Sequence, residues 1–291
     1  MYRRLMVVIG DQSWSDIPVQ YAIALAAETG AELSLLMVLT PPLMAGMSDA
    51  MACTLVVESI IAQSKTVLAD LVATAAQAGI ASTTHVCWGN TTDAVLRTAA
   101  EDDCDLVLVG SHAWTWRGHR LLRHVIKTLT ASARQPLLVV TEPLEETYRG
   151  TNWARLLVVH DGSAASEAAV RYAQALAHAA ALEVCLLDAP GLRQSSGLAP
   201  RRRMSGGEDR LTSLGAGTAT TQGSDVALAV GKTVTAIVET ATDRACDVII
   251  LGAEPLRGWQ RLVYEHTAEV VMANTTLPLL LMNRLVTYSY L

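Results

Sequence analysis

Residues 104–112 read Cys-Asp-Leu-Val-Leu-Val-Gly-Ser-His. Four consecutive Leu and Val residues, bounded by Asp and Gly, are typical of a strand buried on both faces of a parallel sheet. The sequence Cys-Asp-Val-Ile-Ile-Leu-Gly at residues 246–252 repeats this pattern 142 positions later. The spacing predicts that one folding unit occurs twice in the chain.

The repeat extends well beyond these strands. The offset of 142 holds without a gap from Gly89 and Gly231 to Pro136 and Pro278. Near the start the offset is 151, which matches residues 5–8 to residues 156–159 and Tyr21 to Tyr172. The second half is therefore nine residues shorter between these zones. The missing residues fall on its second helix, where residues 191–225 are rich in Gly, Ser and Arg and predict a loop.

Each half alternates short apolar strands with amphipathic helices. In the first half we expect strands near residues 5–10, 33–39, 82–87, 106–110 and 137–141, and helices near 16–29, 54–78, 91–101 and 121–133. This pattern predicts an α/β protein of two tandem, doubly wound, five-stranded parallel sheets. We expect domain 1 over residues 1–142, a linker over 143–153 and domain 2 over 154–291. In such sheets the ligand crevice lies beyond the carboxyl ends of the strands.

The composition excludes several classes of function. The net charge of −6 argues against broad attraction to nucleic acid or to an anionic membrane. The chain contains no apolar run of about 20 residues, the length that spans a bilayer. Its five scattered cysteines lack a Cys-x-x-Cys pair, as in reduced cytosolic proteins. We therefore expect a cytoplasmic protein that binds neither nucleic acid nor membrane.

Four sequence features suggest a phosphate-binding, metal-binding or catalytic site, but none has the full pattern that such a site requires. Gly231-Lys232-Thr233 lacks the leading glycine of a P-loop, and Ser205-Gly-Gly-Glu-Asp209 is not preceded by a strand. The histidines at 112, 119 and 124 have no carboxylate or thiol beside them at a recognised metal-ligand spacing. Cys104 and Cys246 lead into apolar strands, so we expect buried, unreactive thiols. No catalytic or metal-binding residue is predicted.

Residues 104–112 resemble the fourth strand of the universal stress protein family, which reads Asp-Leu-Ile-Val-Met-Gly-Thr-His. Residues 156–163 are similar to the family's opening Val-Asp-Gly-Ser, and residues 135–140 to its closing Cys-Pro-Val-Leu-Val-Val. The resemblance covers nearly the whole chain twice and implies a tandem member with two adenine nucleotide alpha hydrolase-like domains. In nucleotide-binding members, the motif Gly-x-x-Gly, nine residues, then Gly-Ser/Thr wraps the phosphates. An acidic residue at the end of the first strand contacts the nucleoside.

Most of that motif is absent here. The first half keeps Gly110 and the second half keeps Gly252; the other positions hold Ala113, Arg123 and His124, and Pro255, Glu265 and His266, respectively. The strand-end acid is retained as Asp161, whereas Gly10 stands at its place in the first half. Bulky side chains obstruct backbone N–H groups that would hold phosphate, and a glutamate repels it. Arg123 could itself bind an anion. The sequence therefore leaves open whether the first half binds a nucleotide.

The leading interpretation is a non-catalytic regulatory or interaction module of the stress response, with no cofactor and with an unidentified protein or small-ligand partner. One alternative is an adenine-nucleotide sensor that binds ATP or AMP at a single degenerate site, comprising Gly110 and Arg123 or Asp161 and Gly252, with at most slow hydrolysis. Another is a small-ligand binder that uses domain 2 near Asp161. Two readings also remain for the tryptophans at 114, 116 and 259: cover for an emptied crevice, or an aromatic surface for a partner.

The last strand of each half predicts how the halves associate. Residues 137–141 and 279–282 are short and apolar, and each is introduced by a proline. An open sheet edge of this kind invites pairing, and covalent linkage favours pairing within one chain. In the family, such strands commonly pair antiparallel between two copies. We therefore expect an internal pseudo-two-fold dimer through these strands, with the tail at 285–291 supporting a weaker homodimer.

Overall fold

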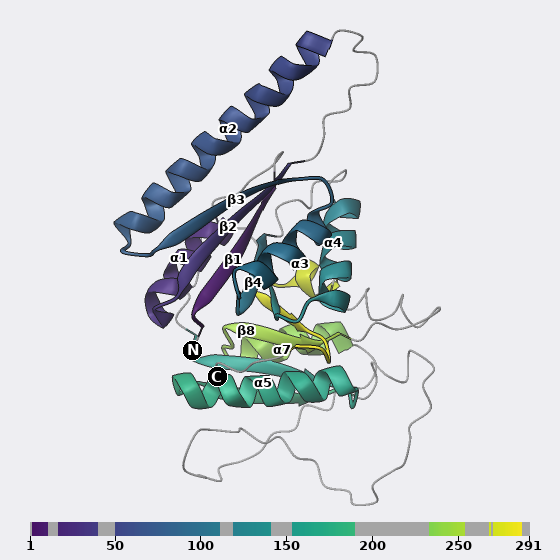
Figure 1. Ribbon diagram of the computed structural model, residues 1–291. Coiled ribbons are helices and arrows are strands. Elements are labelled where there is room, and N and C mark those ends of the chain that lie inside the picture. Colours follow the sequence, from purple (N-terminus) through teal and green to yellow (C-terminus); the bar gives the residue numbers. More distant parts are fainter. Residues whose placement is uncertain are drawn as a thin grey trace, which may run out of the picture. The chain divides into compact units, whose positions relative to one another are not determined.

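The computed structural model describes residues 2–10, 17–39, 50–110, 119–140, 153–189, 233–253, 268 and 270–286 (Figure 1). The chain divides into two compact units, residues 2–125 and residues 126–291. The division falls inside one helix, α4 (His119–Ser132). Each unit contains its own set of paired strands.

The first unit is built on four parallel strands. They are β1 (Arg4–Gly10), β2 (Glu32–Leu39), β3 (Ser82–Trp88) and β4 (Leu106–Gly110), in the order β3-β2-β1-β4. The connecting helices are α1 (Ile17–Thr29), α2 (Ala50–Gln77) and α3 (Thr91–Glu101). Strand order reverses at β1, where the chain winds first to one side and then to the other (Figure 1). This reversal is the switch point of a doubly wound sheet.

The local sequence explains where α3 begins and why β2 and β4 are buried. Asn90 caps α3, because its side chain accepts hydrogen bonds from the N–H groups of Thr92 at 2.8 Å and Asp93 at 3.3 Å. All residues of β2 after its first are buried, and so are the first four of β4. Such continuous burial is the pattern of a central strand covered on both faces. The apolar runs in the sequence therefore form the middle of the sheet.

The second unit contains five described strands. They are β5 (Leu137–Val140), β6 (Arg155–His160), β7 (Glu183–Asp188), β8 (Val248–Gly252) and β9 (Leu279–Met282), in the order β5-β9-β8-β6-β7. The helices are α5 (Ala164–Ala180) and α7 (Thr233–Asp243), and residues 268 and 270–274 are also helical. Strands β6 to β9 pair in parallel. The two strands that close the predicted repeats, β5 and β9, pair antiparallel.

The expected pairing of the two terminal strands is confirmed. Leu137 lies opposite Leu281, and Val139 lies opposite Leu279. All residues of both strands are buried. The strand that ends the first repeat therefore pairs with the last strand of the second repeat, and it lies in the second compact unit.

A buried asparagine strengthens this junction. Asn283 directly follows β9 and is 2% exposed. Its Nδ2 donates hydrogen bonds to the carbonyl oxygens of Thr130 and Ala133 at the end of α4, the latter at 3.0 Å. Its Oδ1 accepts from the N–H of Leu285 at 2.6 Å. Residues some 150 positions apart are therefore joined by side-chain as well as strand hydrogen bonds.

The predicted elements of the first half are confirmed to within a few residues, the largest difference being that α2 begins at Ala50 rather than near 54. Tandem doubly wound folding is likewise confirmed. The structure does not describe the predicted loop at 191–225, most of the predicted linker, or the tail beyond Val286. Trp153, the last residue of the predicted linker, is buried.

Candidate functional site

The carboxyl end of β6 carries the acidic residue that the sequence singled out. Asp161 follows β6 and is only 4% exposed. Its Oδ1 accepts a hydrogen bond from the Ser163 N–H at 2.9 Å. Gly162 between them has a φ of +77°, a conformation that side chains disfavour, so the Asp-Gly-Ser sequence supports a tight turn into α5. Among the described residues, no group hydrogen-bonds to Asp161 Oδ2.

The first turn of α5 is capped by its own side chains. Ser163 Oγ accepts a hydrogen bond from the Ser166 N–H at 3.0 Å, and Ser166 Oγ donates to the Ser163 carbonyl at 2.9 Å. Helix N-terminal N–H groups hold phosphate in many nucleotide sites. Here the Ser166 donor is already occupied, and Asp161 occupies the Ser163 donor.

Gly252, at the end of β8, lies against the same helix turn. A Cβ at this position would lie 2.2 Å from the Ser166 nitrogen and 2.4 Å from the Ala165 carbonyl carbon. Both are backbone atoms that cannot rotate away. Only glycine fits between β8 and α5, so helix packing alone requires it. The structure thus brings Asp161 and Gly252 together around the start of α5.

A histidine and a carboxylate lie at the same edge of the sheet. His160 Nδ1 is 3.4 Å from Asp188 Oδ1, and the two residues end the paired strands β6 and β7. The hydrogen bond to Asp188 raises the pKa of His160, and the negative charges of Asp188, Asp161 and Glu167 act in the same direction against the effect of burial. This edge therefore favours a protonated imidazole.

The matching edge of the first unit is described only in part. Gly110 ends β4, and a Cβ there would lie 2.5 Å from Cγ of Pro18 in α1. Gly10 ends β1, and residues 11–16 are outside the described part of the chain. Arg123 lies within the backbone of α4, but its side chain is not described. His124 likewise lies within the backbone of α4 with its side chain not described. The remaining motif positions and the tryptophans lie outside the described part of the chain: Ala113, Pro255, Glu265, His266, Trp114, Trp116 and Trp259.

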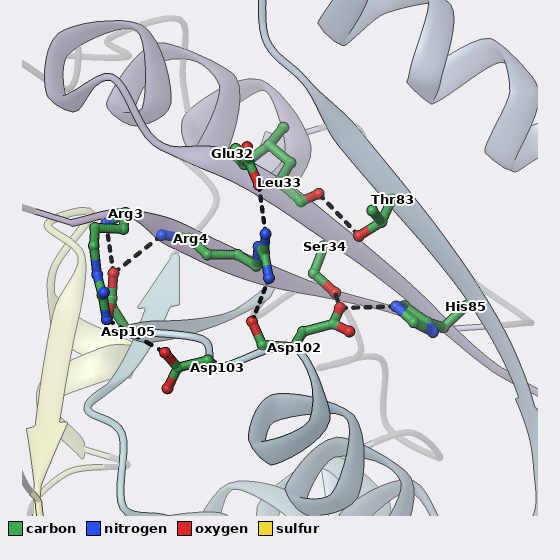
Figure 2. Close-up of polar contacts among 10 residues, drawn as sticks. All are labelled: Arg3, Arg4, Glu32, Leu33, Ser34, Thr83, His85, Asp102, Asp103 and Asp105. Atoms are coloured by element: carbon green, nitrogen blue, oxygen red, sulfur yellow. Dashed lines mark hydrogen bonds and ion pairs between the residues drawn. The ribbon is translucent and has the colours of Figure 1, made fainter.

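The opposite, amino-terminal edge of the first sheet holds a network of charged side chains (Figure 2). Asp105 Oδ2 accepts hydrogen bonds from the N–H groups of Arg3 and Arg4, the latter at 3.0 Å. The Arg4 guanidinium donates to the Asp102 carbonyl oxygen at 2.6 Å and to Glu32 Oε2 at 2.5 Å. These contacts tie the start of β1 to β2 and to the turn before β4.

The second unit repeats this network at the expected offsets. Asp247 Oδ2 accepts from the N–H groups of Ala154 and Arg155, both at 2.8 Å. The Arg155 guanidinium donates to Glu183 Oε2 at 2.7 Å and to the Arg244 carbonyl oxygen. Asp105 and Asp247 recur at the offset of 142, which by itself assigns them no role. The structure shows that they hold together the amino ends of the strands.

Three polar side chains of the first unit lie close together but are not linked in the order of a catalytic triad. They are Ser34, His85 and Asp102. Ser34 Oγ donates to Asp102 Oδ2 at 2.6 Å, and His85 Nε2 lies 2.8 Å from the same oxygen. In a nucleophilic triad the histidine stands between the serine and the carboxylate. Here Asp102 is central and Ser34 is fully buried. The arrangement satisfies buried polar groups and does not activate a nucleophile.

The cysteines predicted to be buried are buried. Cys104 and Cys246 are 4% and 1% exposed, respectively. Burial, together with the negative charge of Asp102, raises the pKa of Cys104 to about 12. Within the described ranges no three His, Cys, Asp or Glu side chains form a metal-binding group. Of the helices that the structure describes, none is long and apolar enough to span a membrane.

Comparison with known proteins agrees with the fold. The family model described as "Universal stress protein family" matches the chain twice, over residues 1–141 and 152–283. A universal stress protein from Archaeoglobus fulgidus DSM 4304 has a similar structure, with 14% identity, a TM-score of 0.68 and 96% of each chain covered. A functionally unknown protein from Pseudomonas aeruginosa PAO1 has 17% identity and a TM-score of 0.57, with 97% of this chain and 92% of that chain covered. No curated protein matches by sequence.

Proposed function

The chain belongs to the universal stress protein family as a tandem two-domain member, and we propose that it is a non-catalytic regulatory module whose two nucleotide positions are degenerate. Universal stress proteins act in the stress response, and the function proposed here is a role in regulation through binding. The expected partner is a protein or a small ligand, and the expected location is the cytoplasm.

One observation carries this proposal: packing accounts for both glycines that remain of the phosphate motif. The absence of a side chain at Gly252 leaves room for the first turn of α5, and its absence at Gly110 leaves room for the ring of Pro18. Their presence therefore does not require a bound nucleotide. The other glycine positions of both motifs hold larger residues. Because the Ser166 and Ser163 N–H groups are also occupied, the start of α5 offers phosphate few of the donors that it needs.

Native mass spectrometry of the full-length protein, purified without added nucleotide, tests this function. We expect the mass of the bare chain or of the chain with a ligand that is not a nucleotide. The spectrum should not change when ATP is added at a concentration that saturates a micromolar site. Recovery of the protein with stoichiometric ATP or AMP would favour the nucleotide-sensor alternative.

A second candidate function is supported by Asp161 Oδ2, which accepts no hydrogen bond from any residue that the structure describes. A buried carboxylate oxygen without a hydrogen-bond partner costs free energy, and a ligand that donates a hydrogen bond would remove that cost. This favours a small ligand with a hydroxyl or amino group at the carboxyl edge of domain 2, beside His160 and Asp188.

Asp161→Ala and Asp161→Asn separate this candidate from the first. If Asp161 Oδ2 accepts a hydrogen bond from a ligand, both substitutions should release the molecule that the wild type carries after purification. Alanine has no acceptor, and asparagine places an NH2 donor where one of the two carboxylate oxygens stood. Retention of the ligand by Asp161→Asn and Asp161→Ala alike would exclude Asp161 as its binding residue. Asp243→Ala and Asp243→Asn, at an exposed position of α7, are the matched controls and should leave the ligand in place.

A further inference from the structure

Strand β3 stands at one end of the strand order (Figure 1). It pairs with β2 along its whole length, from Ser82 opposite Leu33 to Trp88 opposite Leu39. No strand that the structure describes pairs with its other side, which we call the outer edge of β3. An unpaired strand edge presents a row of N–H and C=O groups that can pair with another strand. The function proposed above does not use this edge.

The ladder between β2 and β3 shows which backbone groups of β3 point to the outer edge. The Leu33 N–H donates to the Ala81 carbonyl oxygen at 2.9 Å, and the Gly89 N–H donates to the Leu39 carbonyl oxygen at 3.1 Å. Alternate residues of a parallel strand bond to the same neighbour, so the odd-numbered residues of β3 bond to β2. The even-numbered residues therefore direct their N–H and C=O groups to the outer edge. These residues are Ser82, Thr84, Val86 and Trp88.

The sequence of β3 lacks the features that keep an edge strand from pairing. Edge strands are commonly protected by charged side chains, by proline, by a bulge or by being very short. Residues 82–88 read Ser-Thr-Thr-His-Val-Cys-Trp, which contains no Lys, Arg, Asp, Glu or Pro. The pairing with β2 runs through all seven residues without a bulge. The outer edge is therefore suited to a partner strand.

Large apolar side chains are exposed beside this edge. Trp88 is 40% exposed and Val86 is 37% exposed, and the two lie on one face of the sheet because they are two residues apart. Leu55 is 59% exposed and belongs to α2, the helix that packs against β3. Only one other large apolar side chain is exposed among the described residues. Tryptophan is enriched among the residues that contribute most to protein interfaces. The flank formed by β3 and α2 thus has the character of an interface.

We propose that the outer edge of β3 binds β3 of a second copy of this chain, antiparallel across a two-fold axis at Val86. In this arrangement each outward N–H of one copy meets an outward C=O of the other. Val86 lies opposite Val86 of the second copy, and Trp88 lies opposite Thr84. A pair of an aromatic and a β-branched side chain stabilises antiparallel strands.

The charges of β3 favour a second copy as the partner. Close to a two-fold axis each side chain meets its own counterpart, so a charged residue at this edge would repel itself. The outward residues of β3 carry no charge. The odd-numbered side chains lie on the opposite face, where His85 contacts Asp102 at 2.8 Å and Cys87 accepts a hydrogen bond from Arg97 at 3.4 Å. Self-pairing therefore brings no like charges together along β3.

Sedimentation equilibrium of the full-length protein tests the pairing. The wild type should form a dimer in the micromolar range. Val86→Lys should raise the dissociation constant of the dimer by at least roughly tenfold, because two ammonium groups would meet at the axis. Leu285→Lys is the matched control, since it adds the same charge at an exposed apolar position of the second unit. It should leave the constant unchanged, and thermal unfolding verifies that both variants are folded.

Amide hydrogen exchange of the wild type tests the same edge without a substitution. The N–H groups of Thr84, Val86 and Trp88 should exchange rapidly in dilute protein and become protected as the concentration rises through the dissociation constant. The N–H groups of the odd-numbered residues of β3 bond to β2, so they should be protected at every concentration.

Three results would overturn the proposal. One is a wild type that stays monomeric in the micromolar range, which would leave the edge to a strand of another protein. Another is a dimer that Val86→Lys leaves intact; its dissociation by Leu285→Lys instead would place the interface near the end of the chain. The third is exchange at Thr84, Val86 and Trp88 that does not depend on protein concentration.

Discussion

At the scale of single residues, the packing of Gly252 decides how the candidate site is interpreted. The glycine is one of two that remain of a phosphate-binding motif, and its immediate neighbours are the backbone atoms of Ala165 and Ser166. A residue required by packing persists whether or not a ligand binds. Asp161, by contrast, has a buried oxygen that no described residue uses. Of the two, Asp161 is the residue whose presence points to a ligand.

We predict that Gly252→Ala destabilises the protein by about 2–4 kcal/mol, because the added methyl group forces β8 and α5 apart. Urea unfolding measures the change. Gly10→Ala is the matched control: no atom of a described residue lies within 4 Å of the position that its methyl group would take. Its effect should stay within about 0.5 kcal/mol. Equal effects of the two substitutions would contradict the packing role of Gly252.

The ion pair of His160 with Asp188 predicts a dependence of stability on pH. Because the pKa of His160 is raised in the folded state, its contribution is complete below the ordinary histidine value and is lost as the pH rises through the raised value. Asp188→Asn should therefore destabilise more at a pH of about 5.5 than at about 8.5. The partners are partly exposed, so the difference should be a few tenths of a kcal/mol. The control Asp243→Asn, at an exposed position of α7, should destabilise equally at both pH values. A larger destabilisation by Asp188→Asn at the higher pH would contradict the predicted ion pair.

At the scale of elements, the pairing of β5 with β9 links the end of one repeat to the end of the other. The strands supply the buried apolar surface, and Asn283 supplies partners for the last carbonyl groups of α4. Those carbonyls belong to a helix of the first repeat, whereas Asn283 belongs to the second. The junction is therefore specific in its polar contacts as well as in its apolar ones.

Asn283→Ala should destabilise the protein by about 2–4 kcal/mol, because the Thr130 and Ala133 carbonyls and the Leu285 N–H lose their partner in a buried site. Thermal or urea unfolding measures the loss. Asn274→Ala is the control, since the Asn274 side chain also donates to a helix carbonyl, that of Val270, but is exposed. It should cost less than about 1 kcal/mol. A loss at Asn283 no larger than that at Asn274 would show that the buried contacts do not stabilise the junction.

The extent to which the sequence predicts these elements depends on the kind of signal. Continuous apolar runs such as residues 106–109 and repeated offsets identify strands, because a doubly buried strand tolerates few polar residues. The role of Asn283 was not predicted, since its partners lie about 150 positions away and its counterpart in the first repeat is Thr141.

At the scale of the whole molecule, duplication has preserved the framework and changed the groups attached to it. Arg4 and Arg155, Glu32 and Glu183, and Asp105 and Asp247 make equivalent contacts in the two units. The residues around these pairs differ: Ser34 corresponds to Cys185, and Asp102 corresponds to Arg244. Asp161 similarly follows β6, whereas glycine ends β1. The retained acid therefore places the candidate ligand site in the second unit.

Isothermal titration calorimetry with ATP tests most directly whether both nucleotide positions are degenerate. The wild type should release no binding heat at micromolar concentrations of nucleotide. A variant that restores the motif in the second half, Pro255→Gly with Glu265→Gly and His266→Ser, should gain affinity because Asp161 is already present. Micromolar binding by the wild type that is lost in Asp161→Ala, or in Gly110→Val, would contradict the account.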